Sequence, residues 1–183
     1  MIYFVGGAPR AGKSILSQRI SAKLKIGWIS TDLLMDLLRV KNDEGVKVGW
    51  NAAPEAIAAT AEWFFPYLQR FTWGVSSIAE GYVIEGVDFL PTQVAQLSDQ
   101  YNIRAVFLGC SKMTLEQFNQ YPGRSRGYAD LPEAMQRQIV QDIPLWSEFV
   151  RQEAERFGYP YVDMIDGFPS RLSEAEAVLT IEC

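Results

Sequence analysis

Residues 2–14 read IYFVGGAPRAGKS, and this stretch decides the fold. It opens with Ile2 to Val5, a β-rich apolar run that suits a strand buried on both faces. Glycines then interrupt the run, and beyond them Leu16, Ile20 and Leu24 recur every four residues, which is the spacing of one helix face. The stretch therefore predicts a strand, a glycine-rich loop and a helix in direct succession.

The loop itself has the pattern G-x-x-x-x-G-K-[ST], which predicts phosphate binding when it lies between a strand and a helix. Glycines let consecutive backbone N–H groups curl round a phosphate, and the start of the following helix adds positive partial charge. We expect Lys13 to reach the β- and γ-phosphates of a nucleotide, and the Ser14 hydroxyl to bind Mg²⁺. The expected nucleotide-binding residues are Gly7, Ala8, Pro9, Arg10, Ala11, Gly12, Lys13 and Ser14.

Short apolar runs alternate with helical patterns along the rest of the chain. We expect further strands at 26–29, 75–79, 103–108 and 159–162, with helices after Thr31, over 54–71, near 91–100, over 135–157 and over 174–180. Pro144 should kink or split the helical stretch that contains it. This alternation predicts an α/β protein with a parallel sheet, and the length favours a single domain over residues 1–183.

The composition limits the chemistry. The 183 residues include no histidine, so Ser-His and Cys-His nucleophile pairs are excluded and the commonest zinc ligand is missing. Acid–base chemistry must fall to Asp, Glu, Lys, Tyr or Cys. The 17 basic residues against 22 acidic residues give a net charge of −5, and this balance gives no reason to expect a nucleic-acid partner.

Cysteine usage and hydropathy indicate the cellular compartment of the protein. Cys110 and Cys183 lie far apart and have no metal-ligand spacing, so we expect free thiols in a reducing compartment. The apolar opening lacks a basic leader, and no apolar run reaches ~18 residues. We therefore expect a soluble, cytoplasmic protein with no membrane partner. The oligomeric state stays open.

The loop and the order of the expected elements resemble the P-loop NTPases. More narrowly, they resemble the small nucleotide and metabolite kinases, a branch that includes adenylate and shikimate kinases, chloramphenicol phosphotransferases and zeta-type toxins. The resemblance extends over nearly the whole chain. It implies a three-layer αβα fold with a five-stranded parallel sheet, a small acceptor-side helical segment at 41–73 and a short lid at 121–130. It also implies ATP and Mg²⁺ as cofactors and a small-molecule acceptor.

Acidic residues after two expected strands are the candidates for acceptor and metal chemistry. In this branch an acidic residue near the end of the second strand often binds or deprotonates the acceptor hydroxyl, which makes Asp32 the candidate base. An aspartate at a helix start also stabilises the helix dipole, so both roles are open. Glu80 follows the expected third strand, and we expect it to bind a Mg²⁺-bound water or the acceptor, or to be an ordinary loop carboxylate.

The turn-rich sequence YPGRSRGYAD at residues 121–130 occupies the place of the lid in this branch. It carries Arg124 and Arg126, whose planar guanidinium groups suit the oxygens of a transferring phosphoryl group. An exposed arginine pair on a turn is the alternative. The string DGFPSR at 166–171 follows the last expected strand, and we expect it beside the nucleotide base.

These observations favour an ATP- and Mg²⁺-dependent phosphotransferase that acts on a hydroxyl or phosphate of a small molecule. A nucleoside monophosphate kinase is one alternative. A nucleotide-binding regulatory module without a metabolite acceptor is the other. The sequence after the fourth expected strand is Gly109-Cys-Ser-Lys112, which lacks the Asn-Lys-x-Asp of GTPases and so disfavours GTP.

Overall fold

The apolar run that precedes the glycine loop forms the central strand of a parallel sheet. In the computed structural model, which describes residues 1–41, 52–120 and 131–181, β1 (Ile2–Gly7) lies between β3 (Tyr82–Glu85) and β4 (Ile103–Gly109). The edge strands are β2 (Gly27–Ser30) and β5 (Tyr161–Asp163). The order is β2-β3-β1-β4-β5 and every pairing is parallel, which confirms the expected five-stranded sheet.

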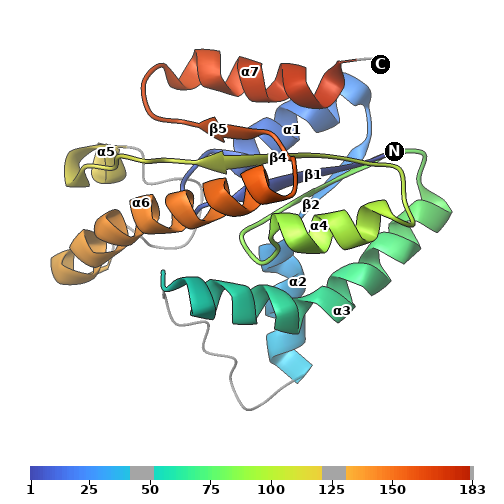
Figure 1. Cartoon of the computed structure of the whole chain (residues 1–183), viewed down its shortest axis with the longest axis horizontal. Helices are drawn as coiled ribbons and strands as arrows, with labels where there is room; N and C mark the ends of the chain where they lie inside the picture. The colour runs from blue at the N-terminus through green and yellow to red at the C-terminus, as the bar shows by residue number, and fades with distance from the viewer. Residues whose placement is uncertain (42–51, 121–130, 182–183) are drawn as a thin grey trace.

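Helices cover both faces of this sheet (Figure 1). One face carries α1 (Lys13–Leu24) and α7 (Phe168–Thr180), and the other carries α3 (Pro54–Ile78), α4 (Pro91–Ser98) and α6 (Glu133–Arg156). The shorter α2 (Thr31–Lys41) follows β2, and α5 (Leu115–Gln120) follows β4. Phe4 belongs to the core under α3, α4 and α6, whereas its neighbour Val5 belongs to the core under α1 and α7. Successive side chains of a strand point to opposite faces of the sheet, so the sheet forms the middle of three layers.

The helix before β3 is longer than expected. Residues 75–78 continue α3, so the strand expected at 75–79 is wrong. Val75 keeps the helical phase of the buried residues Leu68 and Thr72, and it packs into the same core as Leu68. A short apolar run does not distinguish a strand from a buried helix turn, and here the helical phase prevails.

Two elements in the last third of the chain also differ from expectation. Pro144 does not split its helix, because α6 is continuous through it and is anchored in the core on both sides by Ile139 and Val150. Helix α7 begins at Phe168 rather than at residue 174. Gly167 caps α7 in the left-handed region at φ 76°, and Pro169 follows in the first turn, where its lack of an N–H costs nothing.

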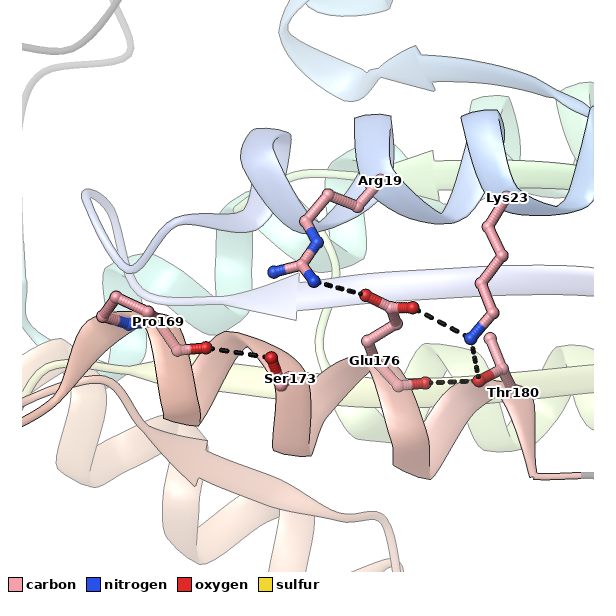
Figure 2. Close-up of polar contacts among 6 residues, drawn as sticks. All are labelled: Arg19, Lys23, Pro169, Ser173, Glu176 and Thr180. Carbon is pink, nitrogen blue, oxygen red and sulfur yellow. Dashed lines mark hydrogen bonds and ion pairs between the residues drawn. The ribbon is translucent and has the colours of Figure 1, made fainter.

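Polar contacts hold α7 against α1, the helix that begins at the glycine loop (Figure 2). The carboxylate of Glu176 lies 3.0 Å from Arg19 Nη2 and 2.9 Å from Lys23 Nζ, so one acidic side chain joins two successive turns of α1. Lys23 Nζ also donates to Thr180 Oγ1 at 3.3 Å. These contacts join α7 to the C-terminal half of α1.

Some expectations fall on residues outside the described ranges. The lid at 121–130 is one of them, and residues 42–51 of the expected segment at 41–73 are another. The remainder of that segment lies mainly in α3. Within the described part of the chain, no helix combines the length and apolarity that a membrane span requires.

Candidate functional site

The loop between β1 and α1 has a backbone that requires glycine. Gly7 has φ 125°, and a Cβ atom there would lie 1.9 Å from the carbonyl oxygen of Leu108 on β4. Gly12 has φ 88°, and a Cβ there would lie 2.8 Å from the ring of Phe168. The loop is therefore held tightly between the end of β4 and the start of α7. This contact places Phe168, from the string at 166–171, beside the loop.

The start of α1 leaves backbone donors directed out of the helix. Gly12 is the N-cap, and because it has no side chain it cannot cap the first N–H groups as serine or aspartate would. The N–H groups of Lys13 and Ser14 have no acceptor one turn earlier within the helix. Together with the helix dipole they create an anion-binding end, as the sequence pattern predicts.

The side chain of Lys13 folds back onto the loop. Its side chain is 7% exposed, and Nζ donates to the carbonyl oxygen of Ala8 at 2.7 Å. Burial lowers the pKa of Lys13, while the carboxylates of Glu85, Asp32 and Asp88 act in the opposite direction. Three carboxylates thus act on the charge of Lys13, and of these only Asp32 is a residue that the sequence pattern predicts for the site.

Ser14 is paired with one of those carboxylates. Its Oγ donates to Glu85 Oε1 at 2.9 Å, and Glu85 is only 3% exposed. Glu85 ends β3 and lies in register with Val5 of β1 and Ser30 of β2. A hydroxyl and a carboxylate are the oxygen ligands that Mg²⁺ takes beside nucleotide phosphates, so this donor set fits Mg²⁺.

Glu80 lies elsewhere. It precedes β3, and its main-chain oxygen accepts a bond of 3.0 Å from the amino group of Met1, at the amino edge of the sheet. The structure does not bring Glu80 together with Ser14, because residues 75–78 are helical and the strand starts after Glu80. The signal for Glu85 was the short run Tyr82-Val-Ile-Glu85, an apolar strand that ends in an acid.

A buried hydroxyl–carboxylate pair lies beside these residues. Thr31 Oγ1 donates to Asp88 Oδ2 at 2.7 Å, and both side chains are buried. Gly86 makes room for this pair, because a Cβ at that position would lie 1.8 Å from Thr31 Oγ1. The pair ties the start of α2 to the segment after β3, and Asp32 follows in the first turn of α2. Asp32 and Lys13 are therefore brought to the same edge.

The arginine of the loop turns toward α5. Arg10 has φ 65°, its Nη2 donates to the carbonyl oxygen of Phe118 at 3.1 Å, and its guanidinium lies 4.8 Å from the centre of the Phe118 ring. Arg10 thus links the loop to the helix that precedes residues 121–130. Arg124 and Arg126 lie outside the described residues.

The fold matches those of solved kinases. The chain superposes on a gluconokinase from Sinorhizobium meliloti 1021 with a TM-score of 0.52 and 16% identity, covering 97% of this chain and 90% of that one. A shikimate kinase from Bacteroides thetaiotaomicron gives 0.52 and 15% over 99% of both chains. A deoxyadenosine kinase from M. mycoides gives 0.52 and 14% over 95% and 96%. No family model and no curated protein sequence matches the chain. The chain has the fold of the small P-loop kinases.

Proposed function

We propose that the protein is an ATP- and Mg²⁺-dependent phosphotransferase that moves the γ-phosphoryl group to a hydroxyl or phosphate of a small molecule. The observation that carries the proposal is the pairing of Ser14 with Glu85 beside Lys13 and the N-terminus of α1. Three structural neighbours are named as small-molecule kinases, a gluconokinase, a shikimate kinase and a deoxyadenosine kinase, and these names support the same class of reaction.

The nucleotide would bind on the loop. Backbone N–H groups at the start of α1 donate to phosphate oxygens, and Lys13 exchanges the Ala8 carbonyl for a β- or γ-phosphate oxygen. Ser14 and Glu85 would hold Mg²⁺, which supplies neutralisation of the charge on the transferring group. Arg124 and Arg126 are proposed to bind the oxygens of the same group and to stabilise its charge. Catalysis then consists of positioning and charge stabilisation.

The acceptor would be activated at the start of α2. Asp32 is the proposed general base, which accepts the proton of the attacking hydroxyl. The Thr31–Asp88 pair fixes this turn against the segment after β3, so it is proposed to position Asp32 rather than to react itself.

Calorimetry of ATP–Mg²⁺ binding tests the proposal. We expect binding to the wild-type protein and its loss in Lys13→Ala, because the loop then lacks its phosphate cation. Lys23→Ala is the matched control, because Lys23 lies on the last turn of the same helix and pairs with Glu176. Circular dichroism should show that both variants are folded. Absence of ATP–Mg²⁺ binding by the folded wild-type protein would sink the proposal.

A screen for ADP release identifies the acceptor and tests Asp32. Nucleoside monophosphates, sugars and small alcohols are compared, which also separates the nucleoside monophosphate kinase alternative. With the best acceptor, Asp32→Asn should lower kcat by ~10²–10⁴-fold and leave ATP affinity unchanged, as expected for loss of a general base. Equal losses in turnover and ATP affinity would argue for a structural role.

A further inference from the structure

The C-terminal part of α3 is apolar on its solvent face as well as on its core face. Residues 63–78 read WFFPYLQRFTWGVSSI and contain a single charged side chain, Arg70. Phe64 and Leu68 are buried in the core, whereas Trp73 lies on the opposite side of the helix and is exposed. A surface helix normally carries charged residues on its outer face, and a helix that is apolar all round is normally buried. This part of α3 therefore has the sequence of a helix that is covered on both sides.

An apolar groove of about 440 Å³ lies between this part of α3 and α2. Both helices are on the side of the molecule opposite α7 (Figure 1). Three leucines line the groove from α2 and mainly apolar residues line it from α3, namely Leu34, Leu37 and Leu38, and Tyr67, Phe71, Val75 and Ile78. Within the described part of the chain its lining includes no acidic residue, and its one cation is Arg70. The guanidinium carbon of Arg70 lies 4.0 Å from the centre of the Trp73 ring, so the arginine extends the apolar surface to that ring.

Exposed side chains continue from the groove over the outer face of α3. The rings of Trp63 and Tyr67 lie with their centres 5.3 Å apart, and Tyr67 also lines the groove. Ile78 is 86% exposed and Leu37 is 70% exposed, while Trp63, Tyr67 and Trp73 are 36–50% exposed. Because a large side chain has roughly 150–250 Å² of surface, these five leave about 600 Å² of apolar surface exposed. Together with the groove lining they form one continuous surface, the α2–α3 patch.

The size and composition of the α2–α3 patch are those of a protein interface. The largest apolar patch of a typical monomer covers roughly 300–600 Å², so this one is at the upper limit. If two copies of the patch met, they would bury about 1,200 Å² in total, which reaches the range of stable interfaces, about 1,200–2,000 Å². Interface centres are also rich in tryptophan, tyrosine and arginine and poor in other charged residues, as this patch is.

The charge of the patch disfavours a membrane surface as its partner. A helix face that binds anionic lipids carries several lysine or arginine side chains. The groove has one cation, and the whole chain has a net charge of −5, which anionic lipids would repel. A second copy of this chain, in contrast, meets no opposing carboxylate in the groove.

The shape of the patch suits a second copy of the same chain. The aromatic pair Trp63 and Tyr67 lies directly beside the groove, so each copy offers both a projecting and a receding surface. A two-fold axis through the patch brings the aromatic pair of each copy to the groove of the other, and such an interface closes after two copies. We infer that the protein forms a homodimer through the α2–α3 patch. This dimer goes beyond the proposed function and does not depend on it.

Sedimentation equilibrium of the full chain tests the dimer. The chain has a mass of 20.6 kDa, and we expect twice that mass at concentrations up to about 100 μM, since even weak complexes with interfaces of this kind have micromolar affinities. Leu37→Lys and Ile78→Lys each place a charge where the two copies meet, and each should raise the dissociation constant of the dimer at least about tenfold. Both parent side chains are exposed in the single chain, so lysine fits the folded monomer at either position.

Leu145→Lys is the matched control, because Leu145 is an exposed leucine of α6 outside the patch, and the dissociation constant should not change. Circular dichroism should show that all three variants are folded. A folded wild-type protein that stays monomeric over this concentration range overturns the inference, and its binding to phosphatidylserine vesicles would then assign the patch to a membrane surface. A dimer that both Leu37→Lys and Ile78→Lys leave intact also overturns it, because the two copies would then meet through another face.

Discussion

The carboxylate of Glu85 is buried at the point where β3 ends beside the loop. A buried carboxylate costs free energy unless charge or hydrogen bonds compensate it. Here Ser14 donates a hydrogen bond to the carboxylate, and the positive charge of Lys13 acts on the same site. Such an arrangement is stable without a ligand and supplies oxygen donors when a divalent cation arrives with the nucleotide.

Glu85→Gln and Glu80→Gln form a matched pair that tests which glutamate serves the metal. Glutamine keeps the size of the side chain and its bond to Ser14, but it removes the negative charge. We expect Glu85→Gln to raise the Mg²⁺ concentration needed for half-maximal ATP turnover by ~10–100-fold. Glu80→Gln should match the wild-type protein, because Glu80 lies at the other edge of the sheet. The opposite ranking in a Mg²⁺ titration would restore Glu80 as the metal residue.

Alanine substitutions at Gly7 and Gly74 should have opposite effects on the free energy of unfolding. Gly7→Ala forces a methyl group against the Leu108 carbonyl at a positive φ, so it should lower the free energy of unfolding by about 3 kcal/mol or more. Gly74 lies inside α3 with open space around it, and Gly74→Ala should raise that free energy by about 0.5–1 kcal/mol. Urea denaturation measures both. A loop that tolerates Gly7→Ala would contradict the geometry described above.

The loop residues could be predicted from sequence because their chemistry is local. Consecutive residues supply the glycines, the lysine and the hydroxyl, so their spacing along the chain is their spacing in space. Glu85 and Asp88 reach the loop through strand pairing, and their positions depend on where β3 begins. An error of a few residues in that boundary moved the expected carboxylate to the opposite edge of the sheet.

At the scale of elements, the boundary of β3 was hard to predict because α3 ends on apolar residues. Val75 and Ile78 read equally well as strand residues, yet Val75 is buried in helical phase and Ile78 is exposed. The strand itself is short, Tyr82–Glu85, and gives little periodic signal. The alternation of strands and helices was predictable because it depends on many residues, and an error in one element leaves the parallel sheet in place.

The contact of α7 with α1 gives a prediction about a whole helix pair. Glu176→Gln removes the charge that pairs with Arg19 and Lys23, both of which are substantially exposed. Exposed ion pairs contribute little, so we expect a loss of less than about 1 kcal/mol in the free energy of unfolding. The loss should shrink further in ~1 M NaCl because salt screens the pair. Urea denaturation at low and high salt checks this. A loss that is independent of salt would assign the effect to packing.

At the scale of the whole molecule, the absence of histidine leaves the middle of the pH range without its usual titrating side chain. The proposed chemistry has no need of one, because phosphoryl transfer requires positioning and charge rather than covalent help. Changes of stability with pH should instead arise at the extremes, from carboxyls at low pH and from buried thiol and phenol groups at high pH.

The thiol of Cys110 gives the alkaline prediction. Burial, with a contribution from Asp163, raises its pKa to about 11, whereas a thiol in the unfolded chain ionises near pH ~8.5. Between these values the unfolded chain binds fewer protons than the folded one, so stability falls as the pH rises. Wild-type protein should therefore lose about 2–3 kcal/mol more than Cys110→Ala between about pH 8 and pH 11, as measured by urea denaturation. Tyr161, whose pKa burial also raises, is present in both proteins and cancels to first order. If the difference in the free energy of unfolding between the two proteins stays constant over this pH range, the thiol ionises as readily in the folded protein as in the unfolded chain.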